Sequence, residues 1–150
     1  MKLEGQVVIH APQERVWEII NDPKQMQHCM PGCDALEDLG GGEFKATLAI
    51  GVATLRGSFE ARLRLSNKQP PTGYRIDVQA TGTSGEMQGG GTVTLAPQGL
   101  GTALTYAGEM QVGGLIATIG QRFLASVIEQ MTEDFFQGLG KVAEQTPASG

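Results

Sequence analysis

Residues 111–142 decide the fold, and they read QVGGLIATIGQRFLASVIEQMTEDFFQGLGKV. Gln111-Val112-Gly113-Gly114 closes a Gly- and Thr-rich stretch of alternating residues, and an uninterrupted apolar helix pattern begins after it. The apolar residues recur with the spacing of one helix face, and they are Ile116, Ile119, Phe123, Leu124, Val127, Ile128, Met131 and Phe135. This spacing predicts one helix from about Gly114 to about Glu144, with Phe123 in the core.

Strand-like segments precede this helix and are separated by short turns rich in glycine and proline. They cover residues 35–39, 43–50, 53–66, 74–81, 86–96 and 101–110. The alternation is clearest where Phe59, Ala61 and Leu63 alternate with charged residues, which indicates one buried and one wet face. Connections this short favour sequential hairpins, so we expect an antiparallel meander.

The N-terminal part predicts one further strand and two short helices. Residues 2–10 form the strand, Pro12 stands at the start of a helix that carries Trp17 into the core, and residues 24–28 form a second helical piece. The long helix can bury its apolar stripe against the concave face of one curved sheet, which makes the class α+β. A cavity between the two would hold an apolar molecule. We expect one domain over residues 1–144 and a disordered tail over 145–150.

The composition excludes several classes of function. The chain of 150 residues has 16 acidic against 11 basic residues and a formal charge of −5, which argues against nucleic-acid binding. It contains no apolar run of about 18 residues, so we expect no membrane span. Residues 1–5 lead directly into a strand pattern rather than an export signal, and two cysteines in such a chain are expected to be reduced thiols. We therefore expect a cytoplasmic protein, with peripheral contact at the inner face of the membrane left open.

The segment Cys29-Met30-Pro31-Gly32-Cys33 raises metal, redox or nucleophilic chemistry. A metal site needs two more ligands, and His10 and His28 do not have a ligand-like spacing with the cysteines. A redox pair normally uses Cys-x-x-Cys, which is one residue shorter, and no third group is in view to orient His28 beside Cys29. We therefore predict no metal, no cofactor and no catalytic residue, with Cys33 a small buried residue in a turn.

Other candidate features have a structural and a functional interpretation. The glycines at 82, 85 and 89–91 precede a strand rather than a helix, which favours sheet curvature over a phosphate loop. Arg122 is either solvent-facing or at the rim of the cavity, and Asp134 lies near the apolar arc of the helix. Four methionines suit either the ordinary core or an adaptable apolar lining, and they are Met26, Met30, Met87 and Met110.

Three stretches together resemble the family of the CoxG subunit of carbon monoxide dehydrogenase, within the START/Bet v 1-like (SRPBCC) helix-grip superfamily. The first combines Leu3-Glu4-Gly5 with Ala11-Pro12 and Val16-Trp17, the second is Met30-Pro31-Gly32-Cys33, and the third is QVGGLIATIGQR at residues 111–122. The resemblance covers about residues 1–144, and Met30 stands where the family usually has leucine. It implies a helix-grip fold: a curved antiparallel sheet of about seven strands around a long C-terminal helix.

The resemblance also implies a function, namely an accessory protein of molybdenum hydroxylases of the carbon monoxide dehydrogenase type. Such a protein assists maturation, recruits the enzyme to the membrane, or delivers a lipophilic electron acceptor such as a quinone. The expected cavity lining is Ile116, Ile119, Gly120, Phe123, Leu124 and Val127. The expected mouth or docking surface is Met30, Pro31, Gly32, Cys33, Val112, Gly113, Gly114 and Arg122, with the two motif segments close together at one end.

Two alternatives to a carrier remain open. One is an enzyme of the same superfamily, a polyketide cyclase or hydrolase, which needs an acid or base inside the cavity; its candidates are His10, His28 and Asp134. The other is a pure docking factor with a closed core. A carrier should retain an apolar small molecule through gentle purification, whereas a docking factor should not.

Overall fold

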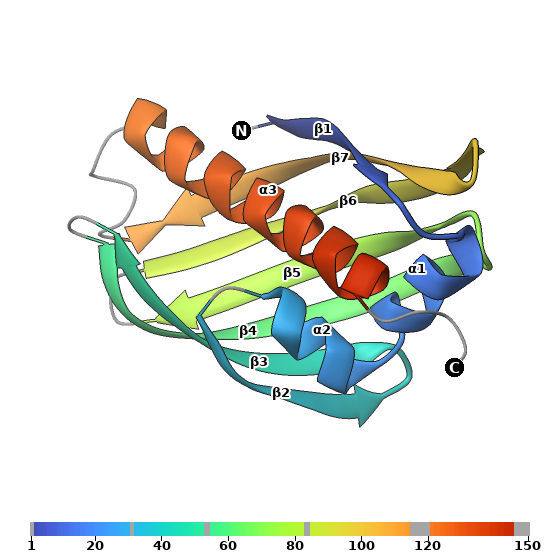
Figure 1. Cartoon of the computed structure of the whole chain (residues 1–150). Helices are drawn as coiled ribbons and strands as arrows, with labels where there is room; N and C mark the ends of the chain where they lie inside the picture. The colour runs from blue at the N-terminus through green and yellow to red at the C-terminus, as the bar shows by residue number, and fades with distance from the viewer. Residues whose placement is uncertain (1, 31, 53–54, 83–84, 115–120, 146–150) are drawn as a thin grey trace.

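The predicted α+β helix-grip architecture is confirmed. The computed structural model describes residues 2–30, 32–52, 55–82, 85–114 and 121–145. A seven-stranded antiparallel sheet curves around one long helix, which runs across its concave face (Figure 1). Two short helices follow the first strand and lie beside the C-terminal part of the long helix.

The elements follow the order expected from the sequence, with longer strands. They are β1 (Lys2–Ile9), α1 (Gln13–Ile20), α2 (Pro23–Cys29), β2 (Cys33–Gly40), β3 (Glu43–Val52), β4 (Leu55–Gln69), β5 (Gly73–Gly82), β6 (Gly85–Gln98), β7 (Gly101–Gly113) and α3 (Gln121–Gln145). Their order in the sheet is β1-β7-β6-β5-β4-β3-β2, so the meander is complete and β1 folds back onto β7. The sheet therefore has two edges, β1 and β2.

Local signals fix the two short helices. Pro12 has an extended backbone immediately before α1, and Asp22 caps α2 by accepting a hydrogen bond from the Lys24 backbone N–H at 3.0 Å. The buried Arg15 of α1 donates to Gln25 of α2 at 3.0 Å. This hydrogen bond ties the two helices together, and they cover one end of the sheet.

The main core lies at the end of the sheet that α1 and α2 cover. The C-terminal half of α3 contributes Phe136, Leu139 and Ala143 to this cluster, together with Ile9 and Leu104 of the sheet. A Cβ on Gly138 would lie 2.8 Å from the carbonyl oxygen of Cys29, so glycine there lets α3 approach α2 closely. The other half of α3 buries Leu124 and Val127 in a smaller cluster around Phe59.

Two sequence expectations for the long helix need correction. Gly114 has a φ of +78°, outside the right-handed helical region, so the helix does not begin at that residue. Phe123 is 36% exposed, and the prediction that it is a core residue is wrong. Trp17 is half-buried, packs against the main core and meets the Tyr74 ring edge-on at a centroid distance of 5.9 Å. Of the predicted tail, Gln145 is the last residue of α3, and residues 146–150 lie outside the described residues.

Candidate ligand cavity

A cavity of about 250 Å³ lies between α3 and the concave face of the sheet. Strands β1 and β3–β7 line it from one side, α3 from the other, and α2 contributes at one flank. From the sheet, the lining side chains include Leu3, Leu48, Leu63, Ile76, Val78 and Met87; from α3 they are Ile128, Met131, Thr132, Phe135 and Phe136. The lining is therefore overwhelmingly apolar.

The cavity is hollow because several inward-facing positions of the sheet have almost no side chain. Gly91 of β6 pairs with Gly108 of β7, and Ala61 of β4 pairs with Ala80 of β5, all among the lining residues. A Cβ on Gly108 would lie 2.6 Å from the carbonyl oxygen of Gly90, because the β6 and β7 backbones approach closely there. The glycines of β6 thus lie in a strand, as the sequence favoured, and leave part of the cavity wall bare.

Methionines form a large share of the wall. Five of the six methionines of the chain line the cavity, and they are Met26, Met30, Met87, Met110 and Met131. An unbranched thioether side chain with three rotatable bonds can repack around occupants of different shape. Of the two interpretations that the sequence allowed for these methionines, the structure thus favours the adaptable lining.

Polar side chains in the wall are sparse. Thr132 of α3 uses its hydroxyl internally, donating to the carbonyl oxygen of Ile128 at 2.8 Å. Tyr106 of β7 stacks its ring on Phe136 with a centroid distance of 4.4 Å. Burial raises the pKa of Tyr106, and the carboxylates of Glu133 and Glu129 raise it further. The phenol therefore stays protonated at neutral pH and can donate a hydrogen bond.

The part of α3 that lines the cavity lies further along the helix than the sequence analysis placed it. Ile116, Ile119 and Gly120 lie outside the described residues. Leu124 and Val127 are buried in the cluster around Phe59, and Phe123 is half-exposed. The described lining from α3 begins at Ile128 and extends to Phe136. Three residues of the predicted apolar stripe, Ile128, Met131 and Phe135, carried this signal, whereas Thr132 and Phe136 were missed.

The two motif segments of the predicted mouth lie at the same end of the sheet. Gly32 accepts a hydrogen bond from the Ala49 backbone N–H at 2.8 Å, and Val112 pairs with Met87 in register. Along the register Ala49 pairs with Ser58, and the strand ends next to Ser58 continue across the sheet to β7. Three strands, β4 to β6, separate the segments along the sheet. A common gate formed by both remains a prediction.

The other predicted mouth residues have varied surroundings. Met30 lines the cavity, and Pro31 lies outside the described residues. Cys33 packs against the buried cluster of alanines Ala46, Ala61 and Ala80. Gly113 ends β7 and Gly114 is exposed, while Arg122 is exposed on the first turn of α3.

The cysteines are free thiols and are held in their protonated form. Cys29 donates to the carbonyl oxygen of Gln25 and Cys33 to that of Ala35, each at 3.3 Å. Burial raises the pKa of Cys29 to about 11 and also raises the pKa of Cys33. Since the thiolate is the nucleophile and the metal ligand, neither thiol is activated for such chemistry. In the described part of the chain, no group of three or more His, Cys, Asp or Glu residues could hold a metal ion.

The candidate acids and bases lie away from the described cavity lining. His10 and His28 are exposed, and the His10 backbone N–H donates to the Glu144 carboxylate at 2.9 Å. Asp134 accepts a hydrogen bond from the Gln130 amide at 2.8 Å. None of His10, His28 and Asp134 is among the described residues that line the cavity.

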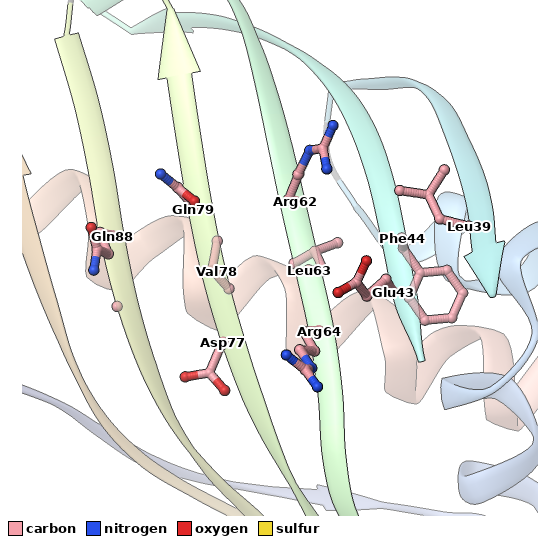
Figure 2. Close-up of a pocket in the computed structure, with 11 residues that line it drawn as sticks. Leu39, Glu43, Phe44, Arg62, Leu63, Arg64, Asp77, Val78, Gln79 and Gln88 are labelled. Carbon is pink, nitrogen blue, oxygen red and sulfur yellow. The ribbon is translucent and has the colours of Figure 1, made fainter. Parts of the chain in front are cut away.

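A second hollow, of about 270 Å³, lies on the side of the sheet facing away from α3 (Figure 2). Its labelled side chains are mostly polar or charged and come from β2 to β6; they include Glu43, Arg62, Arg64, Asp77, Gln79 and Gln88. Arg75 pairs with Asp77 at 3.0 Å on the same face. This hollow is thus a polar depression on the solvent-facing side of the sheet, in contrast to the apolar cavity under α3.

Among the described residues, no helix is both long and apolar enough to cross a bilayer. The comparisons with known proteins place the chain in a family. A model of the family described as the CoxG subunit of carbon monoxide dehydrogenase matches residues 5–144. The crystal structure of a conserved protein from Geobacillus kaustophilus is 32% identical, with a TM-score of 0.91 over 97% of this chain and 96% of that one.

More distant structures share the fold alone. Mll3558 from Rhizobium loti is 17% identical, with a TM-score of 0.74 over 95% of this chain and 96% of that one. Ara h 8.0201 is 10% identical, with a TM-score of 0.72 over 97% of this chain and 99% of that one. Among curated proteins, none matches the chain. The family match and the helix-grip fold together show that the chain belongs to the CoxG family of the START/Bet v 1-like superfamily.

Proposed function

We propose that this chain is a non-catalytic accessory protein of a molybdenum hydroxylase of the carbon monoxide dehydrogenase type, and that it binds an apolar small molecule such as a quinone. The observation that carries the proposal is the apolar cavity between α3 and the sheet. Burying an apolar molecule there gains about 25 cal/mol for each Å² of apolar surface removed from water. A metal or an organic cofactor is not part of the proposal.

The size and composition of the cavity favour a flat or narrow ligand. Its volume of about 250 Å³ is just below the range of about 300–1,000 Å³ typical of small-molecule sites. Rotation of the five lining methionines would widen it on binding. A quinone combines a flat ring with an apolar tail and accepts the electrons that a molybdenum hydroxylase releases, so it fits both the cavity and the partner.

The partner is proposed from the family, whose description names carbon monoxide dehydrogenase. The accessory role would be delivery of the ligand to the enzyme, recruitment of the enzyme to the inner face of the membrane, or assistance in its maturation. Delivery makes the most direct use of an apolar cavity, because a lipophilic ligand needs shielding from water between membrane and enzyme.

An enzyme of the cyclase or hydrolase type has less support. General acid–base catalysis needs a titrating side chain within hydrogen-bond reach of the substrate. His10, His28 and Asp134 are absent from the described lining. Tyr106 does line the cavity, but its raised pKa makes it a hydrogen-bond donor rather than a base at neutral pH.

The test is native mass spectrometry of gently purified protein, followed by organic extraction and identification of any bound molecule. We expect an apolar molecule at one copy per chain, and rebinding of that molecule to the stripped protein. A protein that carries nothing, and binds no quinone in equilibrium dialysis, would instead be a docking factor. The partner is tested separately, by co-purification of molybdenum hydroxylase subunits with the tagged chain.

A further inference from the structure

The concave side of the described cavity wall presents two polar side chains, Tyr106 and Thr132. Thr92 and Glu109 also line the cavity, but both are exposed and alternate with the inward-facing residues of β6 and β7. The Thr132 hydroxyl already donates to the Ile128 carbonyl oxygen. In the described part of the chain, the Tyr106 hydroxyl has no hydrogen-bond partner. It is therefore the polar group that remains available to an occupant of the cavity.

The Tyr106 side chain is held in one place by packing from two sides. Phe136 of α3 stacks on the ring with an interplanar angle of 16°. On the other side the ring crosses β1 at Gly5, where an added Cβ would lie 2.9 Å from the ring atom Cε1. Gly5 pairs with Tyr106 in the sheet register, so the missing side chain at Gly5 makes room for the ring. The hydroxyl is thus positioned at the β1 flank of the cavity.

The surroundings of the hydroxyl divide the cavity into two parts. At the β1 flank, the phenol is half-buried and near the exposed carboxylates of Glu129 and Glu133. At the opposite flank, α2 contributes Met26 and Met30 to the wall. A ligand with one polar end would therefore place that end beside Tyr106 and its apolar remainder under α3.

We propose that Tyr106 selects ligands with a hydrogen-bond-accepting oxygen, such as a ring carbonyl, and binds that oxygen at the β1 flank of the cavity. This inference rests on the proposed function and narrows its ligand class from apolar molecules in general to apolar molecules with a carbonyl at one end. A phenol hydroxyl both donates and accepts hydrogen bonds. The same residue would thus bind the carbonyl of a quinone and the hydroxyl of the corresponding quinol.

The test compares two probes of nearly the same shape. Dimethylnaphthoquinone carries two carbonyls, and its methyl groups block the ring positions at which thiols would add; dimethylnaphthalene lacks the oxygens. Their dissociation constants are measured by equilibrium dialysis with the wild-type protein, Tyr106→Phe and Tyr74→Phe. Tyr74→Phe is the matched control, because Tyr74 is the other tyrosine of the chain and lies in the main core rather than in the described cavity wall.

We expect Tyr106→Phe to weaken quinone binding about 3- to 10-fold, the range that one hydrogen bond supplies, and to leave hydrocarbon binding unchanged. Tyr74→Phe should change neither constant. An unchanged quinone affinity in Tyr106→Phe, or an equal loss for both probes, would overturn the inference while leaving the carrier function intact. Failure of both probes to bind the wild-type protein would contradict the proposed function itself.

Discussion

Replacing Val78 with phenylalanine tests whether the space under α3 is empty and is the ligand site. Val78 lies on β5 and lines the cavity, and its register neighbour on β6 is Gly89, which leaves the adjacent wall without a side chain. A phenylalanine ring at this position would extend into the cavity. It would occupy part of the volume that the proposed ligand needs.

The magnitude follows from the four carbon atoms that the substitution adds. At about 0.8 kcal/mol for each buried carbon, their burial stabilises the fold by at most about 3 kcal/mol. Lost rotamer freedom offsets about 1 kcal/mol, and residual structure in the unfolded chain reduces the gain further. We therefore expect the free energy of unfolding to stay unchanged or to rise by up to about 2 kcal/mol. Quinone affinity should fall at least about 10-fold, which corresponds to about 1.4 kcal/mol.

The assay is urea denaturation combined with equilibrium dialysis of the naphthoquinone probe. Val16→Phe serves as the matched control, because Val16 is fully buried in the main core outside the described cavity lining. Overpacking there should cost about 1–3 kcal/mol. If Val78→Phe destabilises the protein as much as Val16→Phe does, no empty space exists under α3. If Val78→Phe is stable and binds the quinone normally, the cavity is not the ligand site.

Two further predictions concern the core and the titrating groups. Phe136→Ala should cost about 3–5 kcal/mol of unfolding free energy, whereas Phe123→Ala should cost about 1 kcal/mol or less, because Phe123 is 36% exposed; equal losses in urea titrations would contradict the placement of the two rings. The raised pKa of Cys29, about 11, means that the folded protein holds a proton that the unfolded chain releases above about pH 9. Stability should therefore fall between pH 9 and 11, and more steeply in the wild type than in Cys29→Ala; identical slopes would rule out this proton linkage.

The fold could be predicted because its determinants are local and repeated along the chain. Alternation, as in β4 with Phe59 buried and Arg62 exposed, gave the strands, and the turn residues between them required hairpins. The helix start was harder. The apolar pattern begins directly after Gly114, but the positive φ of that residue prevents a helical conformation there, and periodicity does not report φ. Phe123 lies on the predicted stripe, yet a stripe gives the direction of a side chain and not the distance to the facing sheet.

The site was predicted less completely because a cavity depends on what neighbouring strands lack. Gly91 and Gly108 lie far apart in the sequence and form one bare patch only through the pairing of β6 with β7. Alternation could have identified both as inward-facing, and the methionines gave the same indication. The role of Tyr106 depends on Gly5 and Phe136, three contributions from distant segments that no single pattern connects.

The central claim is that an apolar ligand binds under α3, and nuclear magnetic resonance of methyl-labelled methionine tests it most directly. The five lining methionines surround the cavity from α2, β6, β7 and α3, so their methyl groups report on its occupancy from several sides. On titration with dimethylnaphthoquinone, we expect methyl resonances of this set to shift and to saturate at one ligand per chain in the wild type. In Val78→Phe, saturation should need at least about 10-fold more ligand. A quinone that binds without shifting any of these methyl resonances would contradict the account.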